Sequence, residues 1–198
     1  MASEHLVWID CEMTGLDTRR DALVEVACLV TDAELNVVGD GVSVVIKPSE
    51  EALAGMNDFV RQMHTASGLL PLLASGTDMA SAQEEVLAYV RAHTPEGKAP
   101  LAGNTVGMDK QFLERDMPEL MAHLHYRVVD VSSIKELVRR WYPRVFFNAP
   151  EKTGGHRALG DIRDSIRELR YYRETVFTPL PGPDSDAARA AAAGVGEA

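Results

Sequence analysis

The sequence predicts an α/β fold in which helices cover a mixed central β-sheet. Three segments with short connections come first, an apolar run at 5–13 and two valine-rich stretches at 21–32 and 36–47, and they predict an antiparallel meander. Helix and strand patterns then alternate, which is typical of a sheet that also contains parallel strands. With 198 residues, of which 45% are hydrophobic, the chain is long enough for one domain with a full-sized core.

The later elements follow from local patterns. Apolar residues recur at helical spacing in 57–65 and 78–93, so both segments are expected to be helices. The remaining elements are expected in this order: a strand at 99–102, a helix at 108–115, a strand at 127–131, and helices at 132–142 and 161–175.

The composition changes near Pro179, where Pro, Gly, Asp and Ala become frequent. This change predicts a domain that spans 1–178 and a mostly disordered tail at 179–198. Within the tail, Ala187–Ala193 is expected to form a transient helix.

Charge and cysteine usage narrow the function. The chain carries 20 Lys and Arg against 30 Asp and Glu, a net charge of −10, which argues against a long basic groove for polynucleotides. A substrate of two or three nucleotides needs few contacts and stays compatible. The sequence lacks the long apolar run of a membrane span and the pattern of a secretory signal. Cys11 and Cys28 are expected to be reduced thiols in the core. Together these features favour the cytoplasm.

Two carboxylates share one face of the first strand. Asp10 and Glu12 are two residues apart, so their side chains point the same way, and they repel each other unless a cation lies between them. The alternative is a solvated strand end. Asp109 opens a helix after a glycine turn, and its alternative is a favourable interaction with the helix dipole.

The last acidic residue, Asp161, follows a histidine. His156 and Asp161 converge only if His156 lies in the loop before the helix, and Gly154 and Gly155 favour such a loop. The alternative is a surface histidine and an aspartate at a helix N-terminus. Taken together, four carboxylates and a histidine at element ends predict a two-metal phosphodiesterase site. Hard oxygen ligands favour Mg²⁺ or Mn²⁺ over Zn²⁺.

Five blocks of sequence resemble a known family. They are WIDCEMTGLD, GNTVGMDKQFL, HRALGDIRDSI, MHTASGL and HYRVVDVSSIKELVRRW. The first three resemble the motifs of the DEDDh exonucleases, and the last two resemble blocks particular to the oligoribonucleases. The resemblance covers about residues 5–178. It implies an RNase H-like (exonuclease) fold and a metal-dependent 3′-to-5′ exoribonuclease that degrades dinucleotides and other very short RNA to nucleoside 5′-monophosphates.

The resemblance also implies roles for single positions. It makes His156 the general base, a role that suits imidazole because it exchanges protons near neutral pH. The metal ligands that it implies, for two divalent cations, are Asp10, Glu12, Asp109 and Asp161.

The remaining roles concern the substrate. Leu16 would act as a wedge against the terminal bases, and Phe59 and His64 would contact base and sugar. Phe59 stands where the family more often has Trp, which predicts weaker stacking. Thr105 stands where Ser is commoner, and it keeps a hydroxyl for the 5′ phosphate.

One block is implied to reach across a homodimer to the partner's site. It contains Tyr126 as a further catalytic residue and Arg127, Ser132 and Ser133 as substrate contacts. The alternative for these residues is ordinary packing and helix capping, because Ser132 or Ser133 would make a good N-cap.

The sequence leaves two alternatives to an exoribonuclease of short RNA. Another DEDDh exonuclease, such as a proofreading subunit or a tRNA-end trimmer, needs longer substrates and some basic surface, and the net charge of −10 argues against it. A non-catalytic nucleic-acid-binding dimer predicts that at least one metal ligand is lost, whereas all five catalytic positions are intact.

Overall fold

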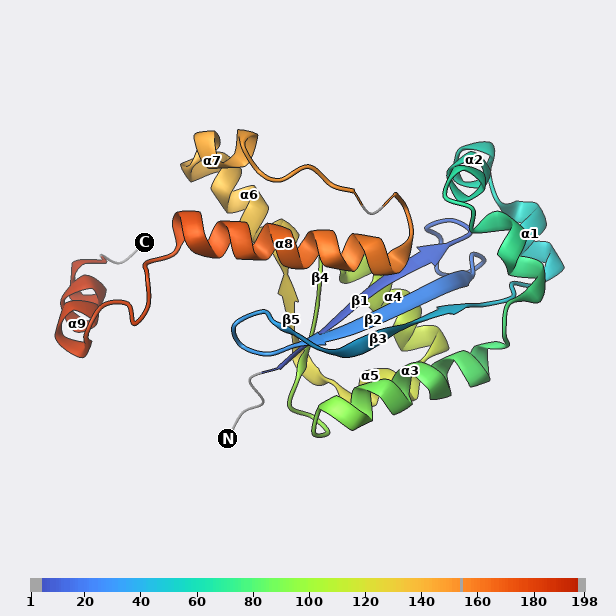
Figure 1. The fold of residues 1–198 in the computed structure, drawn as a ribbon, viewed down its shortest axis with the longest axis horizontal. Helices are drawn as coiled ribbons and strands as arrows, with labels where there is room; N and C mark the ends of the chain where they lie inside the picture. Colours follow the sequence, from blue (N-terminus) through green and yellow to red (C-terminus); the bar gives the residue numbers. More distant parts are fainter. Residues whose placement is uncertain (1–4, 154, 196–198) are drawn as a thin grey trace.

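The computed structural model describes residues 5–153 and 155–195, so the predicted loop residue Gly154 lies outside the described residues. Its sheet has five strands in the order β3-β2-β1-β4-β5, with β1 in the middle (Figure 1). The antiparallel pairs β1–β2 and β2–β3 confirm the meander, and the parallel pairs β1–β4 and β4–β5 confirm the mixed sheet. The strands are β1 (Leu6–Met13), β2 (Leu23–Thr31), β3 (Val37–Val45), β4 (Pro100–Gly103) and β5 (His125–Asp130).

Helices cover both faces of the sheet (Figure 1). One core lies between the sheet and α3 (Met79–His93), α4 (Gly107–Asp116) and α5 (Pro118–His123). The other lies between the sheet and α6 (Val131–Trp141), α7 (Pro143–Phe147) and α8 (Ala158–Val176). A third cluster joins β2 to α1 (Glu50–Gly55), α2 (Asp58–Ala66) and the 3₁₀-helix η1 (Leu70–Ser75).

Alternation along β1 decides where the functional side chains point. Val7 and Ile9 pack into the core under α3 and α4, whereas Trp8 packs into the core under α8. Side chains alternate along a strand, so Asp10 and Glu12 lie on the Trp8 face. The indole N–H of Trp8 donates to Thr31 Oγ1 at 2.9 Å, so the buried indole is satisfied. The central strand therefore presents its two carboxylates to α8.

The structure adds four short elements that sequence periodicity did not predict: α1, η1, α5 and α7. Each has only five or six residues, which is too short for an apolar repeat to be recognised. Start signals are nevertheless present, because Ser49 caps α1 and a proline stands in the first turn of each of the other three.

Two helix starts correct the prediction. Helix α8 begins at Ala158 rather than at residue 161. The N-cap of α6 is Asp130, whose side chain accepts from the Ser132 N–H, so the alternative in which Ser132 or Ser133 caps the helix does not hold. Val131 is fully buried, and packing of this side chain starts the helix one residue earlier.

Within the segment 179–198, the structure contains α9 (Ser185–Gly194), which extends away from the sheet (Figure 1). This helix covers the Ala187–Ala193 stretch where a helix was expected, although the segment was expected to be mostly disordered. None of its residues is buried. The division into a domain at 1–178 and a tail stays a prediction. Among the described residues, no helix is long and apolar enough to cross a membrane.

Candidate active site

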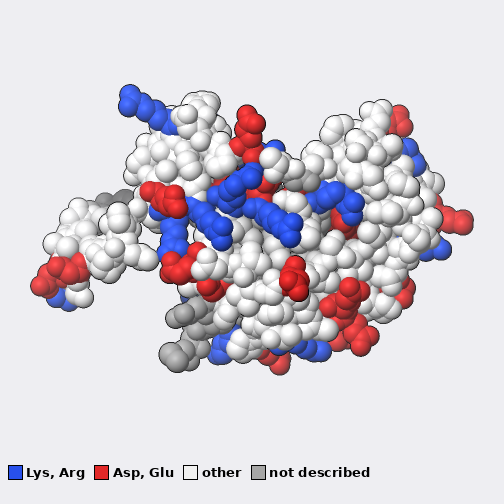
Figure 2. Space-filling model, viewed as in Figure 1, with Lys and Arg blue, Asp and Glu red and all other residues white. Residues whose placement is uncertain are grey.

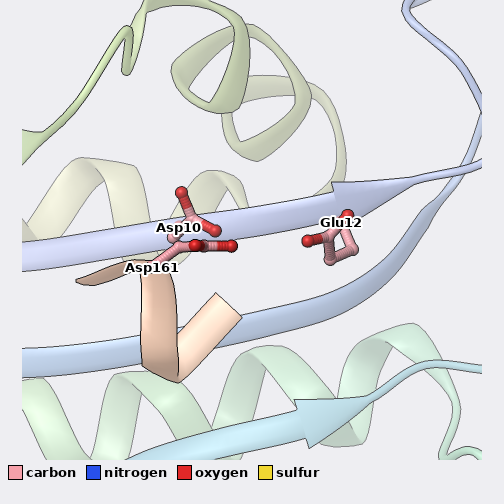
Figure 3. Close-up of side chains that lie close together, drawn as sticks. All are labelled: Asp10, Glu12 and Asp161. Carbon is pink, nitrogen blue, oxygen red and sulfur yellow. The ribbon is translucent and has the colours of Figure 1, made fainter. Parts of the chain in front are cut away.

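Three carboxylates converge at the centre of the sheet. Asp10 and Glu12 extend from β1, and Asp161 reaches them from the first turn of α8 (Figure 3). One oxygen of each side chain lies within 4.8 Å of the others. The strand spacing and the start of α8 therefore bring together three of the four acidic residues that the sequence singled out.

Asp109 is the fourth, and it lies beside this group rather than in it. It is buried in the first turn of α4, and its Oδ1 accepts from the Cys11 N–H at 3.0 Å. Cys11 separates Asp10 from Glu12 on β1, so this hydrogen bond fixes Asp109 against the same stretch of strand. Its negative charge is the second-largest reason why the pKa of Asp10 is raised.

Burial and repulsion together disfavour ionisation of the cluster. The pKa of Asp10 is raised to about 9 and that of Glu12 to about 8, in both cases chiefly by burial and then by neighbouring carboxylates. Burial also raises the pKa of Asp109 to about 6 and raises that of Asp161. Lys152 partly offsets the shifts at Asp10 and Asp161. Closely spaced oxygen donors that repel one another are the arrangement that a hard divalent cation relieves.

His156 lies in the loop before α8, where it must lie to approach Asp161. It is exposed, and its positive charge lowers the pKa of Asp161, as the second-listed influence after burial. Its φ of 57° and that of Gly155, 67°, place two successive residues in the left-handed region. For a non-glycine residue this backbone is strained, so the surrounding contacts must hold it.

The expected base contacts differ in exposure. Leu16 is 69% exposed and Phe59 is 76% exposed, so both apolar side chains are available to a ligand. His64 is fully buried, with Nε2 donating to the Met13 carbonyl at 2.8 Å. Its Nδ1 has no hydrogen-bond partner among the described residues and lies 3.8 Å from Glu12 Oε2. His64 therefore anchors α2 beside the carboxylates, and its contact with a sugar stays a prediction.

One carboxylate oxygen, which the sequence reasoning did not single out, joins two of the expected phosphate contacts. Asp130 Oδ1 accepts from the Thr105 N–H at 3.0 Å and from the Ser132 hydroxyl at 2.6 Å. This fixes the Thr105 backbone, whose φ of 61° is left-handed. Ser133 is exposed on the same first turn of α6. The Asp-Val-Ser sequence at a helix start was the signal that could have identified Asp130.

Tyr126 and Arg127 occupy a bulge in the edge strand. Pro100 pairs with His125 and Leu101 with Val128, so β5 holds two extra residues between consecutive pairs. Both side chains are exposed, and the Arg127 guanidinium lies 5.6 Å from the centre of the Tyr126 ring.

The same-chain carboxylates are out of reach of this bulge. Leu101 is level with Val7, which precedes Asp10 by three residues on β1. Strand geometry then separates the Arg127 and Asp10 backbones by about 10 Å along the strands and about 10 Å across them. The structure thus does not bring Tyr126 and Arg127 to the acidic cluster of their own chain.

Basic side chains gather along α8 (Figure 2). Four arginines recur on this helix at spacings of three or four residues, although the net charge had argued against a basic surface. Three of them are engaged within the chain, so the row is less available than its charge suggests. The row consists of Arg163, Arg167, Arg170 and Arg173. Arg167 pairs with Asp164, Arg170 donates to the Leu35 carbonyl, and Arg173 pairs with Glu34.

Comparison with known proteins agrees with this arrangement. The family model described as Exonuclease matches residues 7–169. The chain is 66% identical to an oligoribonuclease of Streptomyces griseus over 192 residues, which are 96% of each protein. It is 62% identical to an oligoribonuclease of Cutibacterium acnes, covering 91% of this chain and 90% of the relative. It is 56% identical to one of Mycobacterium sp. (strain KMS), covering 98% and 91%.

Solved structures share the fold at low sequence identity. The complex of E. coli exonuclease I with single-stranded DNA in its zinc-bound form superposes with a TM-score of 0.69 at 16% identity. That match covers 88% of this chain, which spans 41% of the exonuclease I chain. Exonuclease I of Methylocaldum szegediense superposes with a TM-score of 0.62 at 23% identity, over 87% of this chain and 41% of that one. These likenesses confirm the exonuclease (RNase H-like) fold.

Proposed function

The chain belongs to the oligoribonuclease family of exonucleases, and we propose that it cleaves dinucleotides and other very short RNA to nucleoside 5′-monophosphates. It is a metal-dependent 3′-to-5′ exoribonuclease that acts on short oligoribonucleotides. The observation that carries the proposal is the convergence of Asp10, Glu12 and Asp161 within 4.8 Å beside Asp109.

These four carboxylates fit two divalent cations. All their donors are hard oxygens, and their mutual repulsion is relieved by positive charge, so Mg²⁺ or Mn²⁺ suits them better than a thiolate-seeking metal. When bound, such cations stabilise the negative charge that develops during phosphodiester hydrolysis. The residues proposed to hold them are Asp10, Glu12, Asp109 and Asp161.

His156 is the proposed general base. It is exposed in the loop before α8 and close enough to Asp161 for their charges to interact. From this position it removes a proton from the attacking water, and Asp161 favours the charged imidazolium that results. Leu16 and Phe59 supply exposed apolar surface against which bases stack.

The 5′ end is proposed to bind in a site shared between two copies of the chain. Thr105, whose backbone N–H donates to Asp130, offers its hydroxyl to the 5′ phosphate, with the exposed Ser133 as a second donor. The Ser132 hydroxyl donates to Asp130, and it joins the phosphate contacts by rotating away from that carboxylate. Because Tyr126 and Arg127 lie two strands away from β1 and about 10 Å along the sheet from Asp10, these side chains are proposed to complete the partner's site.

A homodimer also explains several exposed apolar side chains on β5, α6 and α7. Tyr126 on β5, Leu137 and Trp141 on α6, and Phe147 on α7 are 78%, 45%, 65% and 80% exposed. An edge strand and exposed aromatic side chains are both features of surfaces that another chain covers. Cys11 and Cys28 are free and buried, which supports a cytoplasmic location.

The test is a rate comparison on labelled RNA. Mononucleotide release from a 5′-labelled dinucleotide and from a heptamer is measured with Mg²⁺, with Mn²⁺ and after chelation. We expect faster turnover of the dinucleotide, no turnover without metal, and loss of turnover in Asp10→Asn. The matched control is Asp186→Asn, which changes an exposed aspartate in α9. A heptamer that is cleaved faster than the dinucleotide would contradict the preference.

A further inference from the structure

Two buried glutamates face each other across β1 and β2. Glu12 pairs with Glu25 in the antiparallel register, and they are 8% and 1% exposed. Like charges directly opposite each other destabilise a sheet, so this pair requires a positive partner. Glu12 belongs to the acidic cluster, whereas Glu25 has a different set of contacts.

Arg157 supplies the positive partner to Glu25. Its Nη2 donates to Glu25 Oε1 at 2.8 Å and its Nε donates to Oε2 at 3.1 Å, which is bidentate pairing. The Ala158 N–H donates to Oε2 at 3.3 Å, and the Ser43 hydroxyl donates to Oε1 at 3.2 Å. Glu25 is thus a buried anchor on β2 for the two residues that follow His156.

The other side of the same loop is held separately. The Thr153 N–H and hydroxyl both donate to Asp164, which follows Asp161 by three residues on α8 and is 4% exposed. Arg167 donates to the Glu151 carbonyl. His156 therefore lies in a short segment between two fixed points, and its left-handed backbone is next to one of them.

We propose that the Glu25–Arg157 ion pair is a positioning device for His156. In this role Arg157 and Glu25 act through the backbone, because they fix the chain from which the imidazole approaches Asp161. The inference rests on the proposed role of His156 as general base. The physical reason is that a strained backbone angle, such as the φ of His156, persists only where neighbouring contacts hold it.

The first experiment measures loop order in the metal-free protein, without catalysis. Hydrogen exchange is followed in the peptide covering 151–160 for the wild type, Arg157→Ala and Arg173→Ala. Arg173 is a matched control, because it also pairs with a glutamate and its side chain is 33% exposed against 37% for Arg157. We expect faster exchange in Arg157→Ala only. Unchanged exchange in Arg157→Ala, or an equal rise in Arg173→Ala, overturns the proposal.

The second experiment separates positioning of His156 from an effect on the carboxylates. Arg157→Ala should lower kcat on a dinucleotide roughly 10- to 100-fold, because small misplacements of a reacting group have effects of that size. Its dinucleotide affinity with Ca²⁺ should stay within about twofold. In a His156→Ala background the Arg157 substitution should have no further effect, since the group that it positions is gone. An additive loss in that background overturns the proposal and indicates that Arg157 acts through Glu12.

Conservative variants guard against a general folding defect. Arg157→Lys keeps the charge without the bidentate geometry, so it should restore part of the kcat that Arg157→Ala loses. Glu25→Gln keeps one acceptor oxygen and should behave like Arg157→Lys. If Arg157→Lys is no better than Arg157→Ala, the ion pair does not position His156. A wild-type protein that fails to cleave dinucleotides would refute the proposed function, and the exchange result would then decide by itself whether the ion pair orders the loop.

Discussion

Loading the acidic cluster with metal is expected to expel protons. The pKa of Asp10 is about 9 and that of Glu12 about 8, so both carboxyls are mostly protonated in the metal-free protein at pH 7. The pKa of Asp109, about 6, leaves that group mostly ionised at the same pH. Cations bind the ionised oxygens, so binding at pH 7 should release roughly two protons per chain.

The same values fix the pH dependence of metal affinity. Protons compete with the cation below the raised pKa values, so affinity rises with pH. Between pH 6 and 7 the logarithm of the Mn²⁺ affinity should rise by roughly two per pH unit, and it should level off above about pH 9.

Calorimetry can count the protons directly. Mn²⁺ is titrated into metal-free protein at pH 7 in two buffers of different ionisation enthalpy, and the difference in heat gives the protons released. Repeating the titration near pH 9.5 is an internal control, because the release there should fall to less than about half a proton. The variant Asp186→Asn should match the wild type. Release of less than about one proton at pH 7 would refute the reasoning from burial and repulsion.

Four further outcomes are expected. A carboxyl with a raised pKa binds protons more readily in the folded chain, so Asp10 makes the metal-free fold less stable as pH rises from 3.8 towards about 9. Asp10→Asn should therefore raise the metal-free Tm near pH 8 and leave it unchanged near pH 3. Equal shifts of Tm at both pH values would contradict this. His156→Ala should lower kcat roughly 10²- to 10⁴-fold and flatten the rise of kcat with pH, whereas an unchanged profile would assign the proton to another group. A mixture of Arg127→Ala and Asp10→Ala chains should recover partial activity through hybrid dimers, and persistent inactivity despite demonstrated subunit exchange would exclude shared sites. With Ca²⁺, log affinity for a 5′-phosphorylated dinucleotide should fall with log salt at a slope of about −1 to −2; a slope that steepens in step with length up to seven nucleotides would indicate a polynucleotide track such as the α8 arginines.

Much of the fold could be predicted because its first strands are apolar runs separated by turn residues. These segments predicted the meander, which the antiparallel pairs β1–β2 and β2–β3 confirm. Short helices such as α5 and α7 escaped because packing, rather than periodicity, determines them. The predicted start of α8 was three residues late, because the N-cap residue, Arg157, makes no side-chain capping hydrogen bond and gives no start signal in the sequence.

The site was only partly predictable for a related reason. Asp10 and Glu12 share a face by strand geometry alone, whereas the approach of Asp161 depends on the path of a loop. Glu25 was missed because it acts through a long-range ion pair with Arg157 that no local pattern reports. Asp130 has a local signal as the N-cap of α6, but its bond to the Thr105 N–H joins residues 25 positions apart. The hydrophobic residues around Glu25 in its strand are the clearest sign in the sequence that a cationic side chain from elsewhere in the chain must pair with it.

The two-residue bulge in β5 separates the residues that keep the strand in register from the residues that face a ligand or partner. Residues 126 and 127 stand between two consecutive pairs with β4, and pairing resumes at Val128, so the ladder itself does not use these two positions. Tyr126 and Arg127 are thereby open to change without a shift of strand register, which would turn every following side chain to the opposite face. Substitutions at 126 and 127 can therefore change what this edge of the molecule recognises, while the register of β5 and the core beneath it stay the same.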